Sequence, residues 1–349
     1  MQSVTLDGPC LPLKQGKPPT SCEPGEVVVQ VHAIALSPFE AGLTYDLRHR
    51  LGISKRKQGI GSSFAGEITY VGAADSSPRF LVGDEVVGFV LNPFSDFTFS
   101  THIVVREAVC CRKPLGLSRA LAVSALTDFM IAERTLRLAK ASERDSILIT
   151  GGASPLTKTL IELAKSSMFG VEWVASTVSC MEDRIYSESI GADVVFDTTC
   201  NGGRWSRIFE AGANKKDYDI VIDVVGDWRN AKTLLKKNTG RWTCLLKNPT
   251  PEEILDYNIR VGRNVISTLR TSVVGKLFTG CSRRRENGNF SVIPTGNGEL
   301  LERFFVLLET GILSPSLERV VAPGPETESA ISSLKHDPFG LRGRLVVEF

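Results

Sequence analysis

Residues 151–157, Gly-Gly-Ala-Ser-Pro-Leu-Thr, have the types and the spacing of a turn that could hold a phosphate group. An apolar segment at 147–149 precedes them, and apolar residues recur at helical spacing after them. A strand, a tight turn and a helix N-terminus bind anions because free backbone N–H groups and the helix dipole converge there. We therefore expect this turn to hold the pyrophosphate of a dinucleotide.

The turn lacks two of the glycines that such sites usually carry. Counted from Gly151 in the spacing G-x-x-G-x-x-G, the later positions hold Ser154 and Thr157. Ser154 adds a side chain where a glycine would let the backbone approach the phosphate, but a hydroxyl can donate to a phosphate. Pro155 lacks an N–H group and suits the first turn of a helix. A connection that keeps small residues for packing alone is the alternative. The residues expected to contact the cofactor here are Gly151, Gly152, Ala153, Ser154, Pro155, Leu156 and Thr157.

The end of the next expected strand, at 172–176, bears on which dinucleotide is bound. NAD sites usually carry an acid there, whereas this chain continues from Ser176 as Ser-Thr-Val-Ser-Cys. The missing acid favours NADPH. The hydroxyls of Ser176 and Ser179 or the side chain of Arg184 could then meet the 2′-phosphate. An ordinary polar loop is the alternative.

Two later strand ends should border the nicotinamide ring, because the carboxyl ends of parallel strands line the ligand crevice of such a sheet. Gly226 follows an apolar segment at 219–225. Leu246 ends another segment at 242–246, and Asn248 follows it. Plain loop geometry is the alternative explanation for these residues.

Composition limits the classes of protein that this chain could represent. With 349 residues, 42% hydrophobic and 23% charged, we expect a globular protein of two domains. The net charge of +2 gives no reason to expect a nucleic acid or a membrane surface as partner. No apolar run approaches the roughly 18 residues of a membrane span, and the first residues lack signal-peptide features, so we expect a cytoplasmic protein. The eight cysteines and four histidines have no metal-ligand spacing, so we expect no metal.

The secondary structure that must position these residues changes along the chain, from strands alone to strands that alternate with helices. Residues 26–36, 64–71 and 84–90 have the β-branched, partly alternating pattern of strands, and residues 121–138 have helical spacing. Short apolar strands then alternate with helices, which is typical of a parallel sheet covered on both faces. The expected strands are 147–149, 172–176, 194–196, 219–225, 242–246 and 264–269, and the expected helices are 155–167, 181–190 and 228–237. After a loop at 282–289 we expect helices at 298–310 and 326–335 and a strand at 344–349.

The order of these elements predicts an α/β fold in which a doubly wound parallel sheet, a Rossmann unit, is inserted in a discontinuous β-rich domain. The C-terminal elements resemble the N-terminal region more than the middle of the chain. We therefore expect the β-rich domain to comprise residues 1–122 and 285–349, and the dinucleotide-binding domain residues 123–284.

Seven short motifs occur in an order and at a spacing that identify a family. They are Ser-Pro-Phe-Glu at 37–40, Gly-Ser-Ser-Phe-Ala-Gly-Glu at 61–67, Val-Gly-Asp-Glu-Val at 82–86, Ala-Leu-Thr at 125–127, Ser-Ile-Gly-Ala-Asp at 189–193, Asp-Ile-Val-Ile-Asp-Val-Val-Gly at 219–226 and Gly-Arg-Leu-Val-Val at 343–347. Together they resemble the zinc-independent medium-chain dehydrogenases/reductases, which include quinone oxidoreductases and enoyl reductases. The resemblance implies a GroES-like β-rich catalytic domain. It also places Thr127 beside the nicotinamide, although this hydroxyl could instead bond a preceding carbonyl of its own helix. Asp128, which follows, could cap the helix or approach the site.

Two segments resemble a narrower group. The turn at 151–157 and Leu-Lys-Asn-Pro-Thr-Pro-Glu at 246–252 are similar to segments of fungal trans-acting enoyl reductases, the partners of highly reducing polyketide synthases. This resemblance implies NADPH-dependent reduction of a carrier-bound enoyl thioester in secondary metabolism. A polyketide synthase is then a possible partner.

The proton donor is where the chain departs from the family. The Asn and Asp of the family's N-P-x-D motif are Ser37 and Glu40, and the lysine two positions later is Gly42. Tyr45 and His49 are then the nearest groups that could protonate the α-carbon, and either could equally be a surface residue. Ser63 replaces the Asp of G-x-D-x-A-G, and no histidine occupies the segment that carries a zinc ligand in the zinc-dependent enzymes, so zinc-dependent alcohol oxidation is close to excluded.

Two other functions stay open. The chain could reduce quinones or enones as free small molecules. It could also keep the fold without the redox reaction, as a cyclase, an isomerase or a non-catalytic partner of a synthase, because active-site polar residues are replaced. Basic segments at 48–57 and 283–285 could steer an acidic carrier protein or could be solvated loops.

Overall fold

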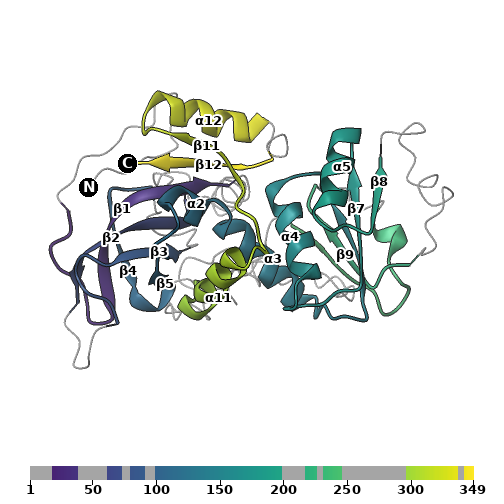
Figure 1. The fold of residues 1–349 in the computed structure, drawn as a ribbon, viewed down its shortest axis with the longest axis horizontal. Coiled ribbons are helices and arrows are strands. Elements are labelled where there is room, and N and C mark those ends of the chain that lie inside the picture. The colour runs from purple at the N-terminus through teal and green to yellow at the C-terminus, as the bar shows by residue number, and fades with distance from the viewer. Residues whose placement is uncertain are drawn as a thin grey trace, which may run out of the picture.

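Two sheets form two lobes of the molecule (Figure 1). The computed structural model describes residues 18–37, 61–72, 79–90, 99–198, 217–225, 231–245, 296–336 and 342–349. A helix, α3 (Leu126–Leu138), lies between the two sheets. We call the two parts the β-rich lobe and the parallel-sheet lobe.

The β-rich lobe is built on strand β1 (Glu26–Leu36), which pairs with three other strands. The sheet has the order β11-β12-β1-β2-β3-β5, and β4 pairs with β1 beside this path. Only the β11–β12 pair is parallel. The other strands are β2 (Ser63–Val71), β3 (Glu85–Phe89), β4 (His102–Arg106), β5 (Cys110–Arg112), β11 (Leu317–Val321) and β12 (Arg344–Glu348). Because Ala33 lies opposite Glu348, strands that are far apart in the sequence pair in one sheet.

The helices of this lobe are α2 (Arg119–Ser124), α11 (Gly298–Glu309) and α12 (Pro325–His336), with a 3₁₀ turn, η1 (Glu107–Val109), before β5. The helical spacing predicted over 121–138 is confirmed, and the chain divides it into α2 and α3 at Ala125. The interruption places Thr127 in the first turn of α3. None of the helices in the described ranges is long and apolar enough to cross a membrane.

The parallel-sheet lobe has the strand order β10-β9-β6-β7-β8, and all of its pairs are parallel. The direction of winding changes between β6 and β9, which is where doubly wound sheets bind ligands. Its elements are β6 (Ser146–Thr150), α4 (Pro155–Lys165), β7 (Trp173–Val178), α5 (Met181–Ser189), β8 (Val194–Asp197), β9 (Ile220–Asp223), η2 (Lys232–Leu234) and β10 (Arg241–Cys244). The strand expected at 264–269 and the loop at 282–289 lie outside the described residues.

Several boundaries differ from the sequence predictions. The helix predicted over 228–237 is wrong at its end, because helical structure stops at Leu234. After Leu234 the backbone pairs with Tyr218, which lies just before β9. Tyr218 N–H donates to Leu234 O at 2.7 Å, and Lys236 N–H donates to Tyr218 O at 2.9 Å. The predicted strand 172–176 continues to Val178. Strands β4, β5 and β11 were not predicted.

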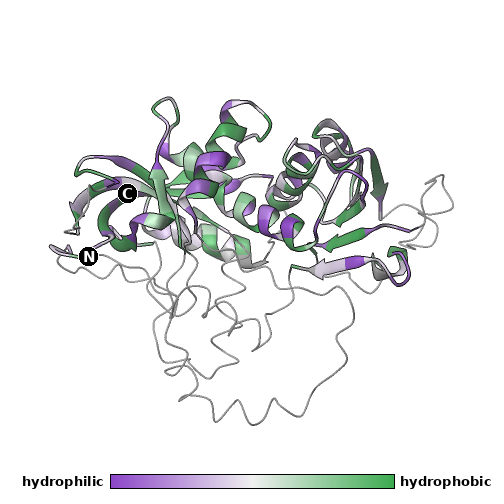
Figure 2. Ribbon diagram, turned by 90° about the horizontal axis from the view of Figure 1, so that it is seen from below, coloured by the Kyte–Doolittle hydropathy of each residue, from purple (hydrophilic) through white to green (hydrophobic). Residues whose placement is uncertain are grey.

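One hydrophobic core runs through both lobes. It joins apolar residues of β1 and β2 to those of α3, α11, β6 and α4. Phe129 of α3 and Phe304 of α11 are fully buried, and their ring centroids are 5.0 Å apart. The helices show hydrophobic and hydrophilic faces, whereas the strands of the parallel sheet are mostly hydrophobic (Figure 2). The shared core fixes α3 between the sheets, with its N-terminus near the site described next.

Candidate functional site

The turn between β6 and α4, residues 151–157, forms a cradle that requires glycine. Gly151 has a φ of +133°, and a Cβ there would lie 2.7 Å from Thr157 Oγ1 and 2.8 Å from the Cβ of Val224. Gly152 has a φ of +63°, and among the described residues a Cβ there would approach within 4 Å only Asp183 Oδ2, at 3.6 Å. A side chain at Gly151 would therefore clash with Thr157 and Val224, whereas a Cβ at Gly152 would make only one ordinary contact with the described residues.

Ser154 begins helix α4 as its N-cap. Its Oγ accepts a hydrogen bond from Thr157 N–H at 3.3 Å and lies 3.0 Å from Thr157 Oγ1. Both residues are buried, and Gly152 N–H donates to Thr177 O at 2.8 Å. No acceptor within the described ranges takes the amides of Ala153, Ser154 or Leu156. Three free amides at a helix N-terminus are the donor set that a phosphate needs, so these residues fit a dinucleotide pyrophosphate.

Thr127 lies at the N-terminal end of α3 and is 2% exposed. Its Oγ1 is 3.3 Å from the Oγ of Ser62, which precedes β2. Ser63, in the place of the family's Asp, accepts a hydrogen bond from Ala35 N–H at 3.4 Å and so serves the sheet. The Thr127 hydroxyl thus lies where the β-rich lobe meets α3.

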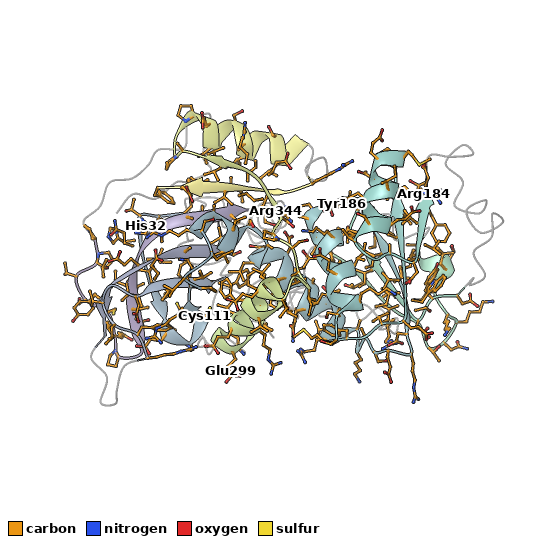
Figure 3. All side chains as sticks on the ribbon, in the orientation of Figure 1. His32, Cys111, Arg184, Tyr186, Glu299 and Arg344 are labelled. Atoms are coloured by element: carbon orange, nitrogen blue, oxygen red, sulfur yellow. The ribbon has the colours of Figure 1, made fainter. Side chains whose placement is uncertain are left out.

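Asp128 and Arg344 form a buried ion pair that the sequence reasoning missed. Arg344 Nε donates to Asp128 Oδ2 at 2.8 Å, and Arg344 Nη2 donates to Asp128 Oδ1. Asp128 is fully buried, and Arg344 is 5% exposed. Arg344 lies where the two lobes meet (Figure 3). The pair joins α3 to β12, so Asp128 holds the arginine of the last strand.

The other residues expected at the site lie in different surroundings, and several lie outside the described ranges. Ser176 lies inside β7, and its Oγ is buried with no hydrogen-bond partner among the described residues. Ser179 follows β7 and is exposed. Arg184 donates from Nε to Glu188 Oε1 at 2.9 Å, one turn along α5. The positions of Tyr45, His49, Gly226, Leu246 and Asn248, and the basic segments 48–57 and 283–285, lie outside the described residues.

Another basic residue is linked to the cradle through Asp183. Arg342 Nη2 is 3.1 Å from Asp183 Oδ1, and its guanidinium lies over the ring of Tyr186 at 5.6 Å. Tyr186 and Arg184 both belong to α5 (Figure 3). Because Asp183 also approaches Gly152, this pair marks one end of the cradle. No spacing in the sequence links residues so far apart, which is why it was not found.

The structure brings no metal-binding group together in the part of the chain it describes. No three His, Cys, Asp or Glu side chains among those residues converge. Cys22, Cys110, Cys111 and Cys180 are free thiols. Burial raises the pKa of the Cys111 thiol to about 12, with the nearby Glu302 carboxylate acting in the same direction.

Comparisons with known proteins point to one family. No family model matches the chain. Probable polyketide synthase 24 of Dictyostelium discoideum is 26% identical over 289 residues, which are 78% of this chain and 11% of that protein. The 2-methylene-furan-3-one reductase of Solanum lycopersicum is 26% identical over 303 residues, 84% of this chain and 64% of the enzyme. A trans-enoyl reductase of Gibberella fujikuroi is 26% identical over 221 residues, 58% of each chain. This chain spans less than two thirds of the length of each relative.

Solved structures have the same fold. The quinone oxidoreductase of Coxiella burnetii superposes with a TM-score of 0.75 and 22% identity, covering 100% of this chain and 99% of that one. The CurK enoyl reductase superposes with a TM-score of 0.72 and 18% identity, covering 99% and 98%. The homologues of this chain are quinone oxidoreductase-like medium-chain dehydrogenases/reductases.

The medium-chain reductase fold agrees with the architecture above. The predicted family resemblance is confirmed, and so is the predicted fold class, a Rossmann unit combined with a β-rich domain. The homologues are oxidoreductases, and a nicotinamide cofactor is common to such enzymes. The roles of individual residues stay predictions.

Proposed function

We propose that this chain is an NADPH-dependent reductase of an activated carbon–carbon double bond. The cradle at 151–157 carries the proposal, because a turn that requires glycine and leaves three amides free opens at the carboxyl edge of a parallel sheet. The enoyl reductases among the relatives and structural neighbours support this class of reaction.

The preference for NADPH is supported by charge at one end of the cradle. No acid occupies the end of β7, where NAD enzymes bind the ribose hydroxyls. Arg342 supplies a guanidinium within 3.1 Å of Asp183, beside Gly152. Arg184, the basic residue expected from the sequence, is instead directed to Glu188. Arg342 is paired with a carboxylate as well, but its partner Asp183 approaches Gly152, so we take Arg342 as the candidate for the 2′-phosphate.

Each part of the chain has a distinct task in the reaction. When bound, the dinucleotide supplies a hydride to the β-carbon of the substrate. The amides of Ala153, Ser154 and Leu156 would hold its pyrophosphate, and Thr127 would approach the nicotinamide side from the first turn of α3. The α-carbon then needs a proton, for which Tyr45 and His49 are the proposed donors. No step requires a metal, and the segment 61–67 lacks a histidine that could bind zinc.

We propose a carrier-bound enoyl thioester as the substrate and a polyketide synthase as a possible partner. The support comes from relatives, since one is a polyketide synthase and another a trans-enoyl reductase. An acidic carrier would meet the basic segments 48–57 and 283–285. A second candidate is a free small enone or quinone, because the relative that covers 84% of this chain is a 2-methylene-furan-3-one reductase.

Nucleotide binding tests the proposal directly. Quenching of intrinsic fluorescence by NADPH should be saturable, and NADH should bind more weakly. Absence of binding to either nucleotide would overturn the reductase and favour a chain that kept the fold without redox chemistry. Turnover then separates the substrates, since oxidation of NADPH with an enoyl thioester but not with simple quinones supports the thioester. The reverse result supports the free small molecule.

A further inference from the structure

Lys158 follows the cradle directly, and its side chain leaves the parallel-sheet lobe. It is 4% exposed and lies in the first turn of α4. Its Nζ donates to Ser314 O at 2.7 Å, to Pro315 O at 3.2 Å and to Ser316 Oγ at 3.1 Å. Three acceptors match the three protons of an ammonium group. The segment 314–316 lies between α11 and β11, so this contact crosses to the β-rich lobe.

Glu162, one turn along α4, contacts the same segment. Ser314 Oγ donates to Glu162 Oε1 at 2.5 Å, and Lys158 Nζ lies 3.9 Å from the same carboxylate oxygen. Burial lowers the pKa of Lys158, and the carboxylates of Glu162 and Asp128 oppose that shift. Asp128 is therefore within electrostatic reach of Lys158, although it belongs to α3.

The contacts continue from this segment to α3. Ser316 O accepts a hydrogen bond from Arg344 N–H, and the Arg344 side chain holds Asp128. Asp128 follows Thr127, the residue expected beside the nicotinamide. A continuous set of buried polar contacts thus joins the first turn of α4, at the phosphate end of the site, to the first turn of α3, at the nicotinamide end.

A buried ammonium costs free energy unless hydrogen bonds compensate it, and an apolar side chain of similar length would avoid the cost of desolvation. The ammonium, unlike an apolar group, fixes the orientation of the Lys158 side chain, because three acceptors hold Nζ against the segment 314–316. Any displacement of that segment would move the turn that ends at Thr157, directly before Lys158. The two ends of the site are therefore held at one spacing.

We propose that Lys158 is a positioning residue that sets the distance between the phosphate cradle and the N-terminus of α3. The inference rests on the proposed function, since it concerns a dinucleotide that contacts both ends. Lys158 itself touches neither the cofactor nor the substrate. Loss of the Lys158 ammonium should lower the affinity for ligands that contact both ends of the site. The affinity for ligands that contact only the cradle should not change.

The test compares two probes on the variant Lys158→Met. NADPH spans both ends, whereas 2′,5′-ADP occupies only the phosphate and adenosine end. We expect the Kd of NADPH to rise about tenfold, a typical coupling between sites, and the Kd of 2′,5′-ADP to change less than about twofold. The matched control is Lys165→Met on the same helix, because Lys165 Nζ contacts Glu172 O and Asp193 Oδ2 within the parallel-sheet lobe. This control should bind both probes as the wild type does.

A milder variant guards against a failure of Lys158→Met to fold. Ser316→Ala removes one of the three acceptors of Lys158. It should raise the Kd of NADPH about threefold and leave the Kd of 2′,5′-ADP unchanged. Hydrogen exchange without nucleotide gives a separate readout, since the amide of Arg344 should exchange faster in both variants and not in the Lys165 control.

The outcomes are distinguishable. Equal weakening of both probes would overturn the inference and indicate a distorted cradle. Unchanged NADPH affinity in Lys158→Met and Ser316→Ala would overturn it and leave the proposed function intact. A wild-type chain that binds neither probe would overturn the proposed function and this inference with it.

Discussion

Gly151 is the residue on which the cradle most depends. Its φ is +133°, and a Cβ would meet neighbouring atoms at 2.7 and 2.8 Å, so there is no room for alanine. We expect Gly151→Ala to lower the free energy of unfolding by about 1–3 kcal/mol and to abolish NADPH binding. Gly116→Ala is the control, since a Cβ at Gly116 meets no atom of the described part of the chain within 4 Å. Urea unfolding and fluorescence titration would measure both effects, and normal NADPH binding by Gly151→Ala would contradict the assignment of the cradle.

Arg342 should decide between the two dinucleotides. Because Asp183 links its guanidinium to the cradle, Arg342→Gln should raise the Kd of NADPH about tenfold or more and leave the Kd of NADH nearly unchanged. Arg319→Gln, an exposed arginine on β11, is the control. Equal effects on NADPH and NADH would instead indicate that Arg342 only pairs with Asp183.

Single residues also show what the sequence could predict. The cradle was predictable because its glycines, hydroxyls and proline are contiguous, and each has a local conformational reason to be there. Lys158, Asp128 and Arg344 were not predicted to act together. Their contacts join segments that are far apart in the chain, and a buried charge has no local signature in a single sequence.

At the scale of elements, the Asp128–Arg344 pair fixes α3 against β12. We expect Asp128→Asn to lower the free energy of unfolding by about 3 kcal/mol, because it leaves the buried guanidinium of Arg344 without its counter-charge. The double variant Asp128→Leu/Arg344→Met should recover much of this loss. Urea unfolding of the wild type, Asp128→Leu, Arg344→Met and the double variant gives the coupling energy. An Asp128→Asn variant as stable as the wild type would show that the pair is not needed.

The elements that were missed differ in how much signal they carry. β5 has three residues, too few to show alternation, and β11 is mostly exposed, with only Val321 buried. β4 alternates between buried and exposed residues, so its pattern could have been found. The break between α2 and α3 occurs at Ala125, a residue with high helix propensity, and tertiary packing therefore determines it.

At the scale of the whole molecule, each lobe contains a carboxylate that is stabilised in its charged form. Burial would raise the pKa of Asp219, but hydrogen bonds from Lys236 and Ser146 outweigh it and hold the pKa below its ordinary value of 3.8. In the β-rich lobe, Lys113 and Arg119 likewise outweigh burial and lower the pKa of Glu85 below 4.5. Both groups bind protons more readily in the unfolded chain, so they stabilise the fold above these pH values.

We therefore expect stability to fall as the pH drops below about 4.5 and through the lowered pKa values of the folded state. Thermal unfolding between pH 7 and pH 3 would measure this. Asp219→Asn and Glu85→Gln should each make the loss of stability with falling pH shallower. The exposed Glu309→Gln should not, and a slope unchanged in all three variants would contradict the expectation.

The pairing of Ala33 with Glu348 has a consequence for synthesis on the ribosome. Strand β1 is made before the parallel sheet, whereas its partner β12 is made after it. The parallel strands within the described ranges end at Cys244, so they can pair with one another while β1 still lacks its pairing with β12. A nascent chain stalled before residue 344 should accordingly yield a protease-resistant fragment containing residues 146–244, with the strands of the first-made lobe still digestible.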